Sequence, residues 1–192
     1  MIARILYSCG KSISYRRKLF DAAFSRSISR LSDLEPAAPF KGCVKVIALD
    51  FDGVLAPHGY PEPSGTMKVW LDGISRSGQF SRIYVYSNKP SESRNRYFQE
   101  NYPEFRFITN VRKKPYPDGL HKIIELEGVA PEVVLMVDDR LLTGILAAAI
   151  AGTSSLYIAK PLADFSSNPA KEIFFAIIRL VERWTIFVIG RT

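Results

Sequence analysis

Five short apolar runs, separated by stretches of helical character, are the feature that most limits how this 192-residue chain can fold. The apolar runs lie at residues 44–49, 82–86, 105–108, 133–137 and 155–158. The stretches between them have the length and pattern of helices and lie at residues 64–77, 91–101, 117–127 and 141–151. Strands that are apolar throughout are typical of a parallel sheet covered by helices on both faces. The sequence therefore predicts an α/β fold with a three-layer, Rossmann-like parallel sheet.

The first forty residues differ from this central part. They are basic and rich in serine, and their apolar residues are spaced as in amphipathic helical turns. This pattern fits an organelle transit segment, a helix on an anionic membrane surface or a solvated helical extension. Pro36 and Pro39 interrupt any helix, so a linker is expected at residues 34–39.

The last segment, residues 168–192, predicts a helix that begins at Pro169. Charged residues interrupt its apolar run near the middle, so no membrane-spanning helix is predicted. A terminal helix packed on the sheet and an amphipathic helix seated in a membrane surface both fit the pattern. We therefore expect a basic extension and linker (1–40), an α/β domain (41–167) and an apolar or amphipathic C-terminal helix (168–192).

The charge balance favours anionic partners. Lys and Arg number 26 against 19 Asp and Glu, which gives a formal net charge of +7. Nucleic acid, anionic lipid and phosphorylated substrates are compatible with this charge, as is a surplus that serves solubility alone. The two cysteines have no CxxC spacing, so a disulfide framework is not expected and a reducing compartment is the default.

Two aspartates mark the end of the first predicted strand. Asp50 and Asp52 follow it directly, at the edge where open α/β sheets bind ligands, and Gly53 then permits a sharp turn. Two carboxylates this close are costly unless a cation or a shared proton lies between them. Oxygen ligands of this kind suit Mg²⁺, and a carboxylate also serves as a nucleophile or a general acid/base.

Polar groups follow three further strands. Ser87 and Asn88 come after the second strand and offer donors to a phosphoryl oxygen, and Lys114 follows the third and offers a positive charge. Asp138 and Asp139 follow the fourth strand, where they would complete a metal site. Each group alone also fits a structural role, such as a helix cap or a solvated lysine. Their recurrence at four successive strand ends favours one phosphate- and metal-binding site.

The order of these groups, DFDGVL, then Ser, then Lys-Pro, then Asp-Asp, resembles the four motifs of the haloacid dehalogenase (HAD) superfamily over about residues 44–160. The resemblance implies phosphomonoester hydrolysis, with Asp50 as the nucleophile that becomes phosphorylated and Asp52 as general acid/base. It assigns phosphate binding to Ser87, Asn88 and Lys114. It assigns Mg²⁺ binding to Asp50, the backbone carbonyl of Asp52, and Asp139, with Asp138 in addition.

The stretches VYSNK, VRKKP and VDDRLLTGILAA resemble the YqeG-type branch of HAD subclass IIIA, which includes phosphatidylglycerophosphate phosphatases. Two features depart from that branch. Asp138 stands where the branch has Gly, and Gly144 stands where it has its final Asp. The loop at residues 58–63 is also longer and richer in proline. The gaps between the motifs are too short for a large cap domain, so we expect an open site.

The sequence thus predicts a Mg²⁺-dependent phosphatase that acts on phosphatidylglycerophosphate at an anionic membrane surface, without a nucleic-acid partner. The alternatives are a soluble HAD phosphatase for a sugar phosphate, nucleotide or nucleic-acid end, and a HAD-like binding module without turnover, which the lack of an acid at Gly144 would favour. The expected location is cytoplasmic and peripheral at the membrane, or mitochondrial or in another organelle if the N-terminus is a transit segment. The sequence makes no prediction of oligomeric state.

Overall fold

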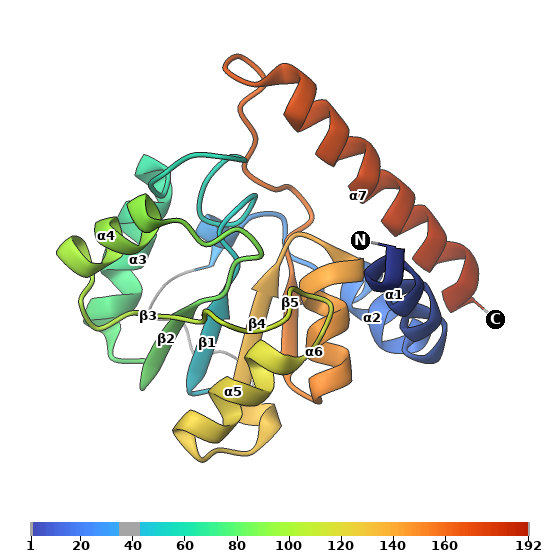
Figure 1. Ribbon diagram of the computed structural model, residues 1–192, viewed down its shortest axis with the longest axis horizontal. Helices are drawn as coiled ribbons and strands as arrows, with labels where there is room; N and C mark the ends of the chain where they lie inside the picture. The colour runs from blue at the N-terminus through green and yellow to red at the C-terminus, as the bar shows by residue number, and fades with distance from the viewer. Residues whose placement is uncertain (1, 35–42, 192) are drawn as a thin grey trace.

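The computed structural model describes residues 2–34 and 43–191 and contains the expected parallel sheet (Figure 1). Most of the predicted linker at residues 34–39 lies outside the described residues. All strand pairs are parallel, and the strand order is β3-β2-β1-β4-β5. The strands are β1 (Val46–Leu49), β2 (Arg82–Val85), β3 (Arg106–Phe107), β4 (Val134–Asp138) and β5 (Ser154–Tyr157).

Helices cover both faces of the sheet, as the apolar strands require. Side chains alternate along a strand, so successive residues of β1 enter different cores. Ile47 and Leu49 pack with α3 (Gly65–Ser77) and α4 (Glu92–Asn101). Val46 and Ala48 pack with α5 (Asp118–Glu127) and α6 (Leu146–Ala151). The predicted three-layer α/β class is therefore confirmed.

The chain order along the sheet reverses at β1. Strand β1 lies between β2 and β4, so the chain runs outward to β3 on one side and then returns to β4 on the other. In open α/β sheets, ligands bind at the carboxyl ends of the strands flanking such a reversal. This topology brings the residues after β1 and β4 to one place.

One predicted helix is divided in two. Residues 141–151 form a π-helical turn, η3 (Leu141–Ile145), followed by α6, and the amide of Leu146 donates to the carbonyl of Leu141. Single π turns are rare and occur frequently at functional sites. The short 3₁₀ turns η1 (Leu31–Asp33) and η2 (Pro131–Val133) complete the connections.

The terminal segments pack on the β5 side of the sheet (Figure 1). Helices α1 (Ile2–Ser14) and α2 (Arg16–Phe24) follow one another, and α7 (Pro169–Gly190) begins at the predicted proline. Leu19 and Ala23 of α2 and Ile186 of α7 share a core with residues of η3 and β5. Among the described residues, no helix is both long and apolar enough to cross a membrane.

Helix α7 is amphipathic in the opposite sense to an ordinary surface helix, which buries its apolar stripe. Three of the side chains that it buries are charged, namely Glu172, Arg179 and Glu182. Its exposed side chains are largely apolar. They are Ile173, Phe174, Ile177, Leu180, Val181, Trp184, Phe187 and Val188.

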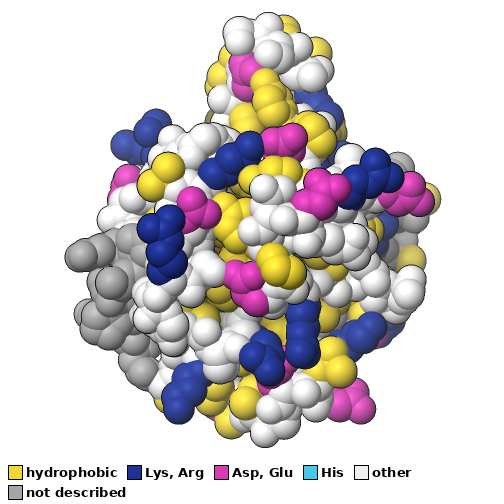
Figure 2. Space-filling model, turned by 90° about the vertical axis from the view of Figure 1, so that its left-hand side faces the viewer, with side chains coloured by type: hydrophobic (Ala, Val, Ile, Leu, Met, Phe, Trp, Pro, Cys, Tyr) yellow, Lys and Arg dark blue, Asp and Glu magenta, His cyan; other side chains and the backbone are white. Residues whose placement is uncertain are grey.

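Helix α1 has the same inverted pattern. It buries Ser8 and Ser12 and exposes Ile2, Ile5, Leu6 and Ile13. By contrast, Figure 2 shows basic and acidic side chains interspersed on the face of the molecule that carries α3 and α4. The exposed apolar side chains of α1 and α7 therefore form a surface of a different kind, which is called the apolar surface below.

Candidate active site

A pocket of about 630 Å³ opens at the carboxyl ends of the central strands. It is lined by all but one of the residues that the sequence assigned to the site, together with residues of α1 and α7. The assigned residues in its wall are Asp50, Asp52, Ser87, Asn88, Lys114 and Asp139. Asp138 lies just behind, because one of its ligand atoms is within 4.8 Å of those offered by Asp50 and Asp139. Side chains far apart in the sequence thus meet at the reversal of the sheet.

Lys114 joins two of these carboxylates at the centre of the site. Its ammonium Nζ lies 2.8 Å from Oδ1 of Asp50 and 2.5 Å from Oδ2 of Asp138, and its side chain is buried. Burial alone would lower the pKa of Lys114, but the two carboxylates outweigh it and raise the pKa. Burial raises the pKa of Asp50 to about 8, against the opposing effect of Lys114.

The buried carboxylates outnumber the cations that contact them. Asp50, Asp138 and Asp139 face Lys114 and Arg179, which leaves one negative charge in excess. Burial raises the pKa of Asp139 to about 7, although Arg179 opposes the shift. A bound proton would neutralise this excess charge, and a divalent cation would more than offset it.

A divalent cation fits these residues. Oδ1 of Asp139 is buried without a hydrogen-bond partner among the described residues, although buried polar atoms are normally paired. Asp138 is less suited as a ligand, because its Oδ2 accepts from Lys114 and its Oδ1 accepts from the amide of Arg140. We therefore expect Asp50 and Asp139 to supply carboxylate ligands to Mg²⁺, and Asp138 to hold Lys114 beside Asp50.

The position of Asp138 explains the unusual glycine at residue 144. A Cβ at Gly144 would overlap the carboxylate of Asp138, so the space is already filled. The carboxylate of Asp138 therefore occupies the space that a side chain at residue 144 would take. The lack of an acid at Gly144 leaves no gap beside Lys114.

Asp52 is held by an arginine that the sequence interpretation missed. Arg94 of α4 donates from Nη2 to Oδ1 of Asp52 at 2.7 Å and from Nη1 to Oδ2 at 3.1 Å, and the amide of Gly59 donates to the same carboxylate. Burial alone would raise the pKa of Asp52, but the hydrogen bonds and charge of Arg94 outweigh it and lower the pKa. Asp52 is therefore a carboxylate at neutral pH, which suits a base. Arg94 gave no signal in the sequence because it lies within a charged helix of ordinary composition.

Ser87 and Asn88 have different surroundings. Ser87 lines the pocket, and its Oγ accepts from the amide of Lys89. The side-chain amide of Asn88 accepts from the backbone N–H of Lys114 at 2.7 Å and donates to its carbonyl at 3.2 Å. Asn88 thus fixes the loop that carries Lys114, and because it also lines the pocket, its role in phosphate binding stays a prediction.

Helix α7 supplies further contacts around the pocket. Glu172 accepts from the backbone N–H of His58 at 2.9 Å and lies 3.2 Å from its Nδ1. Glu182 accepts from Nε of Arg140 at 3.0 Å. Phe175 stacks on the ring of His58 at 3.8 Å between centroids. The charged residues predicted to interrupt the helix therefore include two, Arg179 and Glu182, that reach the site.

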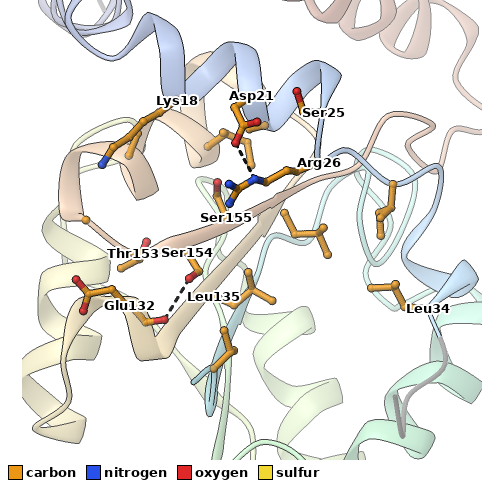
Figure 3. A pocket seen from close by; sticks show the side chains of 17 residues that line it. Lys18, Asp21, Ser25, Arg26, Leu34, Glu132, Leu135, Thr153, Ser154 and Ser155 are labelled. Carbon is orange, nitrogen blue, oxygen red and sulfur yellow. Dashed lines mark hydrogen bonds and ion pairs between the residues drawn. The ribbon is translucent and has the colours of Figure 1, made fainter. Parts of the chain in front are cut away.

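A second pocket, of about 1080 Å³, lies between α2 and β5, away from these residues (Figure 3). Some of its polar groups pair with one another, since Arg26 bonds to Asp21 and Ser154 donates to the carbonyl of Glu132. It contains none of the residues assigned to the site, so its size does not make it the reactive one.

A comparison with known protein families agrees with a site at the carboxyl ends of the central strands. Residues 71–152 match the haloacid dehalogenase-like hydrolase family. The match covers less than half of the chain and runs from α3 to the end of α6, so it includes Ser87, Lys114 and Asp139 but not Asp50 or Asp52. Together with the sheet, it supports the HAD-like form of the α/β fold.

Two crystal structures are similar at low identity. An uncharacterized protein from Listeria monocytogenes serotype 4b shares 17% identity at a TM-score of 0.49, over 59% of this chain and 78% of that chain. A HAD-superfamily hydrolase, subfamily IA, variant 1, from Geobacter sulfurreducens PCA shares 18% identity at a TM-score of 0.44, over 64% of this chain and 90% of that chain. No curated protein matches the sequence.

Proposed function

We propose that this protein is a Mg²⁺-dependent phosphomonoesterase of the HAD type that forms a phosphorylated Asp50. The observation that carries the proposal is the cluster of Asp50, Lys114 and Asp139 at the wall of one pocket, with an excess negative charge and an unpartnered carboxylate oxygen. The match to haloacid dehalogenase-like hydrolases over residues 71–152 supports it. When bound, Mg²⁺ would offset the charge of the phosphoryl oxygens.

The reaction has two steps. A carboxylate oxygen of Asp50 attacks phosphorus, the bond from phosphorus to the ester oxygen breaks, and the leaving alkoxide takes a proton from Asp52 in its protonated form, which the second step regenerates. Water then attacks phosphorus, Asp52 accepts its proton, and phosphate leaves as Asp50 is regenerated. In both steps, the ammonium group of Lys114 stabilises the negative charge of Asp50 and of the phosphoryl group. Because Arg94 keeps the pKa of Asp52 low, Asp52 is better suited to the second step than to the first.

We further propose that the substrate is a phospholipid, with phosphatidylglycerophosphate preferred, and that the protein acts peripherally at a membrane surface. The support comes from the inverted helices. Ile5 of α1 and Phe174, Ile177 and Val181 of α7 belong to the apolar surface and also line the pocket that contains Asp50. Acyl chains could therefore stay in the bilayer while the head group enters the pocket.

The positive charge of helices α1 and α2 also fits binding to an anionic membrane. Helices α1 and α2 carry Arg4, Lys11, Arg16, Arg17 and Lys18 and only one acidic residue, Asp21. Basic side chains beside an apolar helix face are typical of helices that lie on anionic lipid. A water-soluble substrate would give no reason for this arrangement at the pocket.

The test is phosphate release from phosphatidylglycerophosphate in anionic vesicles, and from p-nitrophenyl phosphate in solution, with Mg²⁺ and with EDTA. We expect Mg²⁺-dependent release from both and turnover of the lipid at the higher kcat/KM. Asp50→Asn should abolish both activities, by more than about a thousandfold, because no nucleophile remains. Absence of release from every phosphomonoester by the folded protein would contradict the phosphatase and favour a binding module.

A matched pair of variants tests the lipid substrate separately. Leu180→Gln with Trp184→Gln alters exposed residues of α7 and should lower vesicle binding and lipid turnover at least tenfold, with p-nitrophenyl phosphate turnover unchanged. The control is Val69→Gln, an exposed apolar residue of α3, which should alter neither activity. Equal turnover of soluble phosphomonoesters and lipid, without vesicle binding, would favour the soluble phosphatase.

A further inference from the structure

Helix α7 reaches the metal-binding carboxylate through Arg179. Nε of Arg179 lies 2.6 Å from Oδ2 of Asp139, and both side chains are buried. The other carboxylate oxygen, Oδ1, has no hydrogen-bond partner among the described residues. A single arginine contact thus fixes one oxygen of Asp139 and leaves the other without a protein partner.

The arginine is itself held in place by residues from other elements. Its Nη2 lies 3.4 Å from Nε2 of His58, whose Nδ1 lies 3.2 Å from Glu172. Burial lowers the pKa of His58 to about 4, so its ring is neutral at pH 7. A neutral ring that donates from Nδ1 to Glu172 accepts at Nε2, which is the role that a donor from Arg179 requires.

The backbone after the first strand approaches this ion pair closely at Gly53. A Cβ on Gly53, which has a φ of +87°, would overlap the carboxylate of Asp139 and touch the guanidinium of Arg179. The ion pair therefore packs directly on the turn that joins Asp50 to the loop after it. The geometry of the Arg179–Asp139 ion pair is therefore constrained by the backbone at Gly53 and by the ring of His58.

We propose that Arg179 is a positioning residue for Asp139, so that α7 is a wall of the metal site as well as part of the apolar surface. This inference rests on the proposed function, since it takes Asp139 as a Mg²⁺ ligand. Outer partners that hold metal-binding side chains typically contribute 10- to 100-fold in metal affinity. The opposite role, in which Arg179 competes with the cation, would predict tighter metal binding once the arginine is removed.

The test measures metal binding by the 192-residue chain without substrate, using Mn²⁺ and the loss of its free electron paramagnetic resonance signal. Arg179→Gln should raise the dissociation constant of Mn²⁺ by about 10- to 100-fold. Arg179→Lys restores the charge without the planar guanidinium and should recover part of the affinity. The control, Arg183→Gln, removes the same charge from the same helix at a residue that contacts Phe24 and not the site, and should bind Mn²⁺ as the parent does.

Kinetics add a readout that a purely structural role would not move. For Arg179→Gln, the Mg²⁺ concentration for half-maximal activity should rise by the same factor as the dissociation constant. The kcat at saturating Mg²⁺ should stay within about threefold of the parent, because Arg179 orders a metal ligand and does not touch the reacting atoms. Unchanged or tighter Mn²⁺ binding by Arg179→Gln would overturn the inference. If Arg179→Gln does not fold, the test passes to Arg179→Lys. Weaker Mn²⁺ binding than the parent, by less than 100-fold, would support the inference, because charge alone should recover part of the affinity. Affinity equal to that of the parent, or more than 100-fold weaker in a folded variant, would overturn it.

The two proposals fail in different ways. A parent protein that binds no Mn²⁺, or an Asp139→Asn variant that binds it as the parent does, would contradict the metal site and with it the proposed function. A parent that binds Mn²⁺ and hydrolyses phosphomonoesters, beside an Arg179→Gln variant with the same Mn²⁺ affinity, would contradict the role of Arg179 alone.

Discussion

At the scale of single residues, the buried volume beside Gly144 determines which carboxylate pairs with Lys114. The carboxylate of Asp138 fills the volume above Gly144 and contacts Lys114, which also contacts Asp50. An aspartate at residue 144 would place its carboxylate in the same region. We infer that one carboxylate is needed there and that an aspartate at either position would supply it.

This exchange can be tested by swapping the two residues. Asp138→Gly removes one partner of a buried charge and should lower the free energy of unfolding by about 3–5 kcal/mol. Gly144→Asp alone should also destabilise the protein, because two carboxylates would overlap. The double variant Asp138→Gly, Gly144→Asp restores a single carboxylate beside Lys114 and should recover most of the stability and activity. Urea unfolding and p-nitrophenyl phosphate turnover measure both effects, and Gly65→Ala, at a site with open space, is the control. Additive losses in the double variant would contradict the exchange.

The raised carboxyl pKa values predict how Mg²⁺ and pH act together on stability. Burial raises the pKa of Asp50 to about 8 and that of Asp139 to about 7, so between about pH 4 and pH 8 the native state without metal holds more protons than the unfolded state. The stability that Asp50 and Asp139 contribute to the metal-free native state is therefore lost as pH rises towards 8. Mg²⁺ binds the ionised form, so its stabilising effect should grow over the same range.

Thermal unfolding at pH 6.5 and pH 8, in EDTA and in Mg²⁺, measures this linkage. We expect the Tm in EDTA to fall as pH rises, and the increase in Tm caused by Mg²⁺ to be larger at pH 8. The range from pH 6.5 to pH 8 lies above the titration of His58. Below about pH 6.5, the lowered pKa of His58 would make stability rise with pH and so oppose the effect of the carboxyls. Asp50→Asn should reduce the pH dependence in EDTA. An increase in Tm from Mg²⁺ that is equal at both pH values would speak against buried, protonated carboxyls.

At the scale of secondary-structure elements, the sequence predicts the sheet well because its signals are local. Five apolar runs predicted five strands, and β1 to β5 begin and end within two residues of those runs. The site residues after the strands were also predictable, because parallel strands bring their carboxyl ends to one edge. The division of residues 141–151 into η3 and α6 was not, since no residue there breaks a helix except Gly144.

The contributions of α4 and α7 were missed for a different reason. A charged residue in a helix is usually solvated, so neither Arg94 nor Glu172 stands out in the sequence. Their roles depend on which face of the helix turns inward, and tertiary packing decides that. In α7 the inward face carries the charges because it meets the polar loops at the carboxyl ends of the strands, and the apolar residues are left outside.

At the scale of the whole molecule, the apolar surface would fix one orientation on the membrane that we propose as the site of action. Helices α1 and α7 both line the pocket of Asp50, so the side of the molecule that would enter the lipid is the side on which the pocket opens. The opposite orientation would place the interspersed charges around α3 and α4 against the bilayer (Figure 2). Desolvating those charges is costly, so only the first orientation is favourable.

The two tryptophans of the chain test this orientation directly. Trp184 lies on the apolar surface and is 66% exposed, whereas Trp70, on the buried face of α3, lies in the core and is 3% exposed. Anionic vesicles should therefore shift the emission of Trp184 to the blue and make it accessible to quenchers attached to acyl chains, while leaving Trp70 unchanged. Trp184→Phe should lose the shift and Trp70→Phe should keep it. Because α7 is held to the site by Glu172, Arg179 and Glu182, a tryptophan that stays in water at saturating vesicle concentrations would mean that the pocket faces water too, and a lipid substrate would then have no path to Asp50.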